Sequence, residues 1–146
     1  MFVVLDANHF REHAHGTALG RTLKSRITKH QASVFSCIVA AEESLQGWIS
    51  LVRRERAGPA QIHGYDFLQR TIGTLASLTI LTILTILPFD DEAAAMFQML
   101  ETLRPRIGTM DLKIAAICLV HDATLLTRNL VDFEKVPGLK VENWLD

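Results

Sequence analysis

The chain has 146 residues, of which 49% are hydrophobic and 21% are charged. This balance is typical of one packed globular domain and excludes an intrinsically disordered chain, so we expect a single domain over residues 1–146. The net charge of −1 indicates no class of partner by itself. The two cysteines, Cys37 and Cys118, are too few for a disulfide framework and lie in apolar runs, so we expect buried thiols in a reducing cytoplasm.

The first half of the chain alternates short apolar runs with helical segments. Phe2–Leu5 has the composition of a buried strand, and Asp6 and Asn8 directly after it are residues that suit a helix N-cap. Apolar residues at every fourth position from Leu19 to Ile27 predict a helix whose other faces are basic. The next expected elements are a strand over 34–39 and a helix over 40–57, which Gly58 and Pro59 end.

The second half repeats this alternation. The expected elements are a helix over 63–78, a strand over 83–87, a helix over 90–103, a helix over 110–120 capped by Thr109, and strands over 123–127 and 139–141. The uncharged stretch 71–89 meets the length of a membrane span, but five Thr, one Ser, one Gly and one Pro dilute it. We therefore expect no membrane span and no targeting signal, and interpret this stretch as a buried helix that breaks within 77–82 and continues as a strand.

Helices and short apolar strands in alternation predict an α/β fold, a parallel sheet with helices on both faces. In such a sheet, ligands bind at the carboxyl ends of the strands. Acidic or amide side chains follow these ends or lie in the first turn of a helix: Asp6, Glu42, Glu43, Asp111, Asn129 and Asp132. Each one alone has an ordinary explanation as a helix cap, a turn former or a solvated residue. Their shared placement is what indicates a site.

Several carboxylates gathered at one edge repel one another unless a cation lies between them. Mg²⁺ or Mn²⁺ suits such a site because these hard ions prefer oxygen ligands and keep several waters. A water held there can attack a phosphodiester. The sequence therefore favours a metal-dependent nuclease.

The ordered set of motifs resembles a PIN domain, most closely the VapC-like toxin type. The motifs are LDAN at 5–8, EESLQG at 42–47, DLKIAA at 111–116, TRNLVDF at 127–133 and VPGLKVENW at 136–144. The resemblance implies a three-layer α/β/α fold with a mainly parallel sheet of four to five strands. It also implies an Mg²⁺- or Mn²⁺-dependent endoribonuclease that leaves a 3′-hydroxyl and a 5′-phosphate. Such proteins are commonly homodimers and toxins of type II toxin–antitoxin pairs, in which an antitoxin occupies the active site.

The resemblance also implies roles for individual residues. Asp6, Glu43 and Asp111 match the metal-binding and catalytic carboxylates. Asn129 matches a fourth metal-binding position that is often Asp, and Asp132 matches a nearby catalytic acid. Asn8 and Thr127 match supporting positions.

The choice between Glu42 and Glu43 stays open at this point. The family glutamate precedes a glycine by four residues, as Glu43 precedes Gly47, and this favours Glu43. Helical phase points the other way, because Glu43 lies nearly opposite the apolar stripe that begins at Ala41.

Other features have less defined roles. For RNA contacts we expect Arg21, Lys24, Lys113 and Arg128. His9 is expected at an exposed helix start, with a side possibility that it approaches the scissile phosphate. The apolar stretch 75–87 exceeds what a small core needs, so part of it is expected in a dimer interface.

Two other functions remain open. The domain could have lost catalysis and act as an RNA- or protein-binding module, with Asn129 as a sign of that loss. A receiver-like phosphoacceptor also places an aspartate after a strand. It fits poorly, because residues 127–129 provide no lysine after a late strand.

Overall fold

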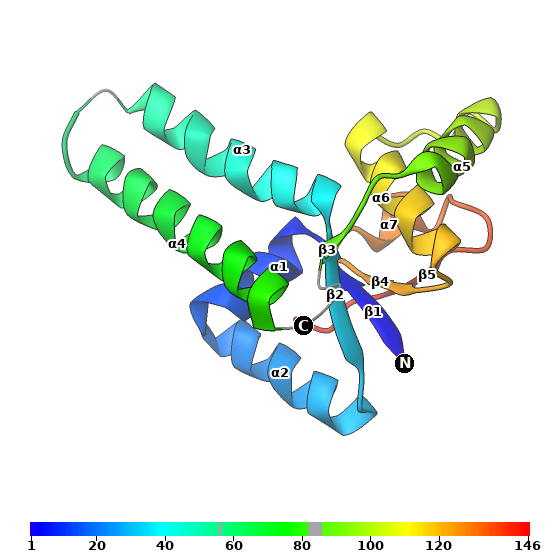
Figure 1. Ribbon diagram of the computed structural model, residues 1–146, viewed down its shortest axis with the longest axis horizontal. Helices are drawn as coiled ribbons and strands as arrows, with labels where there is room; N and C mark the ends of the chain where they lie inside the picture. The colour runs from blue at the N-terminus through cyan, green and yellow to red at the C-terminus, as the bar shows by residue number, and fades with distance from the viewer. Residues whose placement is uncertain (56, 82–85) are drawn as a thin grey trace.

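A five-stranded sheet lies at the centre of the computed structural model, which describes residues 1–55, 57–81 and 86–146, with no side chains described for residues 77–81 (Figure 1). The strand order is β3-β2-β1-β4-β5, and every neighbouring pair is parallel. The strands are β1 Phe2–Leu5, β2 Ser33–Cys37, β3 Ile86–Leu87, β4 Thr124–Leu126 and β5 Lys140–Glu142. All carboxyl ends therefore meet at one edge.

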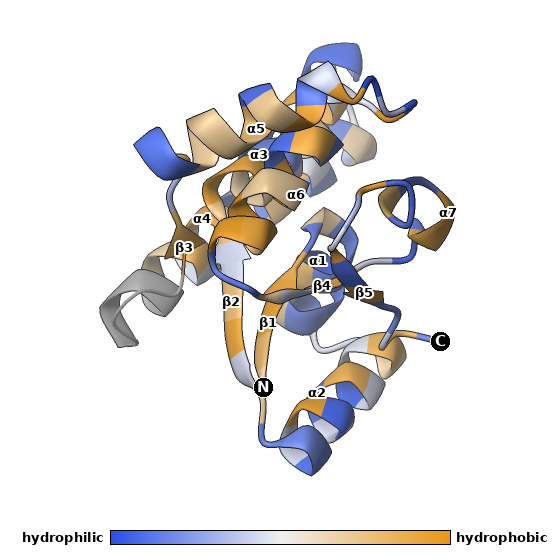
Figure 2. Cartoon of the chain, turned by 90° about the vertical axis from the view of Figure 1, so that its right-hand side faces the viewer, coloured by the Kyte–Doolittle hydropathy of each residue, from blue (hydrophilic) through white to orange (hydrophobic). Residues whose placement is uncertain are grey.

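Helices connect successive strands, as parallel pairing requires. Those described are α1 Ala7–His15, α2 Ala18–His30, α3 Ile38–Arg54, α4 Pro59–Leu81, α5 Asp91–Thr102, α6 Thr109–Val120 and α7 Leu130–Phe133. Figure 2 shows α5 and α6 on one side of the strands and α2 on the other.

Alternate residues of each central strand point to opposite faces of the sheet. Val4 and Leu125 pack into the cluster covered by α5 and α6, which also contains Ile114 and Ile117. On the other face Val3, Leu5 and Leu126 pack against α1, α2 and the C-terminal segment through Phe10, Leu23, Trp144 and Leu145. The expected α/β/α fold with a parallel sheet is confirmed.

The helices α3 and α4 form an antiparallel pair that extends from one side of the sheet (Figure 1). The rings of Trp48 on α3 and Phe67 on α4 stack with centroids 4.8 Å apart. His15, at the end of α1, meets Phe67 edge-on at 5.0 Å. These ring contacts hold α1 beside the pair, and the rings of His15 and Trp48 line the cleft described below.

Several expected boundaries are corrected. The second strand ends at Cys37, not Val39, because the Cys37 sulfur accepts the N–H of Ala40 at 3.4 Å and caps α3, which begins two residues early. Gly108, not Thr109, is the N-cap of α6. The short helix α7 was not expected as a helix, because four residues are too few for a periodic pattern.

The apolar stretch 71–89 is only partly described. Helix α4 runs through to Leu81, so the expected break within 77–82 does not occur over 77–81. Of the expected strand over 83–87, residues 83–85 lie outside the described residues. Within the expected dimer-interface stretch 75–87, residues 82–85 lie outside them and no side chains are described for 77–81. Over the described residues, no helix combines the length and hydropathy that a membrane span requires. Both cysteines are buried thiols, as expected.

Candidate active site

Asp6 lies at the carboxyl end of the central strand β1 and forms the N-cap of α1. Its side chain is 10% exposed. The backbone N–H of His9 donates to Oδ1 of Asp6 at 2.8 Å, and Nδ1 of the His9 ring lies 3.1 Å from the same oxygen. The hydrogen bonds that described residues make to this carboxylate thus converge on one oxygen.

Two further carboxylates lie within electrostatic reach of Asp6. Burial, followed by the charges of Asp111, Asp6 and Glu42, raises the pKa of Glu43 to about 7. Burial, followed by the charges of Asp132 and Asp6, raises the pKa of Asp111. Asp6 at the end of β1, Glu43 on α3 and Asp111 on α6 therefore lie within electrostatic range of one another.

The topology explains this convergence. Helix α3 starts directly after β2, so its second turn, with Glu43, lies beside the sheet's carboxyl edge. Helix α6 leads into the parallel strand β4, so its first turn, with Asp111, lies at that same edge.

The two neighbouring glutamates face different spaces. Glu43 lines a cleft between α1 and the α3–α4 pair, whereas exposed Glu42 lines a mainly apolar hollow with Phe89 and Lys113. The structure therefore places Glu43, not Glu42, on the side of Asp6 and Asn8.

Asp132 takes part in a polar group at the rim of the site. Nδ2 of Asn129 donates to Oδ2 of Asp132 at 3.0 Å, and Nζ of Lys135 lies 3.0 Å from Oδ1. These hydrogen bonds lower the pKa of Asp132. The hydroxyl of buried Thr127 accepts the backbone N–H of Asn129 at 3.0 Å, and so fixes the start of α7.

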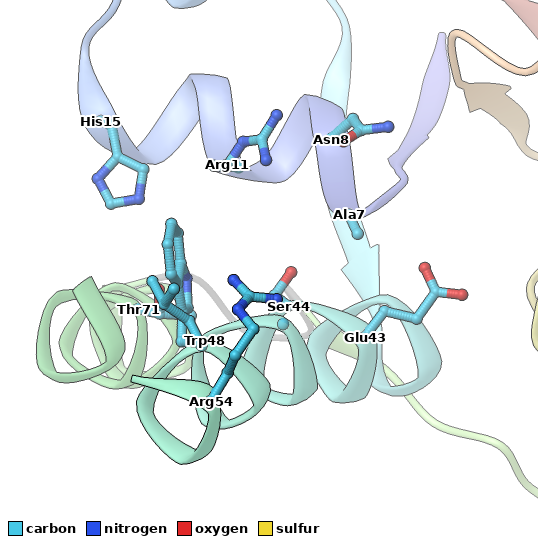
Figure 3. Close-up of a pocket in the computed structure, with 11 residues that line it drawn as sticks. Ala7, Asn8, Arg11, His15, Glu43, Ser44, Trp48, Arg54 and Thr71 are labelled. Atoms are coloured by element: carbon cyan, nitrogen blue, oxygen red, sulfur yellow. The ribbon is translucent and has the colours of Figure 1, made fainter. Parts of the chain in front are cut away.

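The cleft has a volume of about 410 Å³. Figure 3 shows Glu43 and Asn8 at one end and Trp48 and His15 at the other, with Arg11 from α1 and Arg54 from α3 between them. An acidic centre thus opens into a cleft with basic and aromatic walls. Sequence reasoning missed both arginines. Arg54, for example, resembles an ordinary basic residue in the last turn of a helix.

The four basic residues expected to contact RNA lie elsewhere. Arg21 and Lys24 are exposed on α2. Lys113 lies over the rings of Phe89 and Phe97, 5.8 Å from each centroid. Arg128 makes a two-point contact with Asp146, through Nε at 3.1 Å and Nη2 at 2.9 Å. None of the four lines the cleft.

His9 is not at an exposed helix start, so that expectation was wrong. Its side chain is fully buried, and its Nε2 accepts the backbone N–H of Trp144 at 3.3 Å. The sequence contained no pairing signal for His9, because Trp144 is far away along the chain.

The carboxylates fit a hard divalent ion in chemistry. As arranged, no three Asp, Glu, His or Cys side chains of the described residues form a ready ligand group. Mg²⁺ sites commonly use only one or two carboxylates and complete their coordination with water. The repulsion that helps to raise the pKa of Glu43 is relieved by a cation, so the donor set suits such an ion.

The fold and site define a three-layer α/β/α domain with carboxylates at the carboxyl edge of a parallel sheet. A PIN domain profile matches residues 3–139. The chain therefore belongs to the PIN domain family.

Individual relatives add detail. Ribonuclease VapC2 of Rickettsia felis is 45% identical over 38 residues, which are 26% of this chain and 28% of that protein. The match thus spans little more than a quarter of that relative. A chain in the structure of VapBC2 from Rickettsia felis bound to a promoter DNA fragment has a TM-score of 0.71 at 21% identity, with 99% of each chain covered. A chain of VapBC-1 from nontypeable Haemophilus influenzae has a TM-score of 0.69 at 17% identity over the full length of both.

Proposed function

We propose that the protein is a metal-dependent endoribonuclease that hydrolyses RNA phosphodiesters and is the toxin of a type II toxin–antitoxin pair. The observation that carries this proposal is the placement of Asp6, Glu43 and Asp111 at the carboxyl edge of the parallel sheet, with Glu43 in the wall of the cleft. Membership of the PIN domain family supports it, as does the similarity of one segment to Ribonuclease VapC2.

Asp6, Glu43 and Asp111 are the residues proposed to hold the cation, Mg²⁺ or Mn²⁺, with Asn129 as a neutral ligand. A cation held by these residues would supply an activated water and would screen the charge that develops on the phosphate. Asp132 adds negative charge beside Asp111, and Lys135 and Asn129 hold its carboxylate in place. Thr127 orients the backbone of Asn129.

The cleft is the proposed path of the RNA strand. Arg11 and Arg54 offer cationic donors for phosphates, which offsets the repulsion between RNA and the acidic centre. Asn8 supplies an amide at the end of the cleft nearest Glu43. Arg21, Lys24, Lys113 and Arg128 stay as outer candidates for RNA contact.

The proposed protein partner is a cognate antitoxin. Several solved structures with this fold are VapBC complexes, and their chains match almost all of this one. An antitoxin that covers the cleft would block RNA. The proposed assembly is a homodimer, and the proposed compartment is the cytoplasm, where RNA is available.

The test is cleavage of end-labelled RNA by the purified chain with Mn²⁺, with Mg²⁺ and with EDTA. We expect cleavage with the ions only, and its loss in Asp6→Asn and Asp111→Asn. Asp122→Asn is the matched control, because it removes a carboxylate that is 92% exposed and paired with Lys140. Full activity in the Asp6/Asp111 double variant would overturn the assignment. RNA binding without ion-dependent cleavage would indicate a binding module instead.

A further inference from the structure

A fully buried imidazole connects the acidic centre with the C-terminal segment. Nδ1 of His9 lies 3.1 Å from Oδ1 of Asp6, and Nε2 lies 3.3 Å from the backbone nitrogen of Trp144. The side chain of His9 has no exposed surface. Both ring nitrogens therefore have partners, and the ring does not reach a substrate in the cleft.

The hydrogen bonds determine the tautomer. A backbone N–H can only donate, so Nε2 must be the acceptor and carry no hydrogen. The hydrogen of the neutral ring is then on Nδ1 and points to Oδ1 of Asp6. Two donors, the backbone N–H and Nδ1–H of His9, thus converge on one carboxylate oxygen.

The C-terminal segment, whose Trp144 is the partner of Nε2 of His9, is itself held in place. Nη1 of Arg26 on α2 donates to the carbonyl oxygen of Asn143 at 3.2 Å. Arg128 holds Asp146 through two hydrogen bonds. The ring of buried Trp144 stacks on His30 with centroids 4.9 Å apart. The backbone N–H of Trp144 is therefore held in place and fixes the orientation of the His9 ring.

We propose that His9 is a positioning residue for Asp6. Its Nδ1–H holds Oδ1, which would leave Oδ2 for a divalent ion, and the C-terminal segment fixes the ring through Trp144. This inference rests on the proposed function. Carboxylate ligands are commonly oriented by such outer hydrogen bonds, and their loss typically lowers metal affinity or activity by roughly 10- to 100-fold.

Two substitutions of His9 test the roles of its two ring nitrogens separately. In His9→Asn the amide nitrogen can replace Nδ1 and donate to Asp6, whereas in His9→Gln the amide oxygen can replace Nε2 and accept from Trp144. The readouts are Mn²⁺ affinity by calorimetry, kcat and KM for RNA cleavage, and Tm without metal. We expect His9→Gln to retain Tm but to lose roughly 10- to 100-fold in Mn²⁺ affinity and in kcat. His9→Asn should retain Mn²⁺ affinity and kcat even where Tm falls.

Opposite results overturn the inference. Wild-type Mn²⁺ affinity in His9→Gln would do so, as would losses in both variants that simply follow Tm, which is the result of a merely structural role. A wild-type chain that neither binds Mn²⁺ nor cleaves RNA would instead defeat the proposed function.

If the His9 variants fail to fold, a measurement on the unmodified His9 ring still tests the inference. We expect long-range ¹H–¹⁵N spectra to show His9 as the Nδ1–H tautomer. We expect Mg²⁺ to shift its Nδ1 resonance in the wild-type chain but not in Asp6→Asn. An Nε2–H tautomer, or a resonance that Mg²⁺ does not move, would contradict the inference.

Discussion

Glu43 on α3 and Asp111 on α6 belong to separate helices, yet the charge of Asp111 contributes, after burial, to the raised pKa of Glu43. The two carboxylates are therefore close enough to disfavour joint ionisation in the metal-free protein. Burial, followed by this repulsion, disfavours the ionised form of Glu43 in the folded protein, and a cation beside it would relieve the repulsion.

The pH dependence of stability follows from this pKa. A carboxyl group whose pKa rises from 4.5 when unfolded to about 7 when folded contributes stability below pH 4.5, and that contribution is lost as the pH rises to about 7. We expect Glu43→Gln to raise the Tm of the metal-free protein by roughly 2–4 °C at pH 8, and by much less at pH 5. Thermal unfolding at both pH values, in EDTA, measures the difference.

Glu42→Gln is the control, because it removes the same charge from the neighbouring, exposed position. It should change Tm less than Glu43→Gln at pH 8. Added Mn²⁺ should stabilise the wild-type chain more than Glu43→Gln. Equal effects of the two variants on Tm at pH 8 would show that ionisation of Glu43 does not destabilise the folded protein.

The cleft predicts which arginine contacts RNA. Arg54 lines it and Arg53 does not, although both are exposed in the last turn of α3. In a cleavage-deficient Asp6→Asn background, we expect Arg54→Gln to weaken binding of single-stranded RNA and to reduce the salt slope of log K by roughly 0.7. Arg53→Gln should leave both nearly unchanged. Filter binding over a salt series measures both quantities. Identical results for the two variants would mean that RNA does not bind in the cleft.

Gly47 provides a way to fill the cleft without disturbing the core. A Cβ built at this position meets no heavy atom within 4 Å, and Gly47 lies on the cleft wall one helical turn after Glu43. We expect Gly47→Leu to stabilise α3 by up to about 1 kcal/mol, because glycine is a poor helix former. RNA cleavage should fall by roughly tenfold, because RNA loses its near-attack position.

Gly47→Ala is the matched variant, since it gives a similar helix gain with much less volume. Unfolding in urea and initial cleavage rates separate the two effects. Unchanged cleavage in Gly47→Leu would mean that RNA does not pass this wall.

Gly20 predicts a stability effect far from the chemistry. A Cβ there would lie 2.1 Å from the carbonyl oxygen of Glu12, so α2 approaches the backbone of α1 closely only because residue 20 is glycine. We expect Gly20→Ala to lower the free energy of unfolding by about 1–3 kcal/mol. Gly73→Ala in α4, where a Cβ meets nothing within 4 Å, should instead be neutral or stabilising by about 0.5–1 kcal/mol. Urea unfolding curves that show equal effects would contradict the close approach.

Much of the fold could be predicted from local pattern. Phe2–Leu5 and the four-residue spacing from Leu19 to Ile27 gave the correct kind of element, because burial of one face leaves a periodic trace in the sequence. Boundaries were less accurate where a cap depended on an unusual group, as with the sulfur of Cys37. The helix α7 could not be predicted, since its four residues make little more than one helical turn and are too few to show a repeated pattern.

The candidate site, like the fold, could be predicted only in part from the sequence. Sequence spacing placed Asp6 and Asp111 at the carboxyl edge of a parallel sheet, because Asp6 follows a strand and Asp111 begins a helix that starts at that edge, and the family resemblance then implied their roles. It could not decide between Glu42 and Glu43, since both lie near that edge and only the packing of α3 against α1 determines which one faces the cleft.

The order of strands, helices and acidic residues along this chain is enough to determine a parallel α/β domain with carboxylates at one edge, because those features follow from periodicity and chain direction. Only the tertiary structure decided that His9 is buried against Asp6 and Trp144, and that Arg11 and Arg54 line one cleft. These relationships join residues whose distance along the chain carries no pattern. They arise from how α1, α3 and the C-terminal segment pack in space.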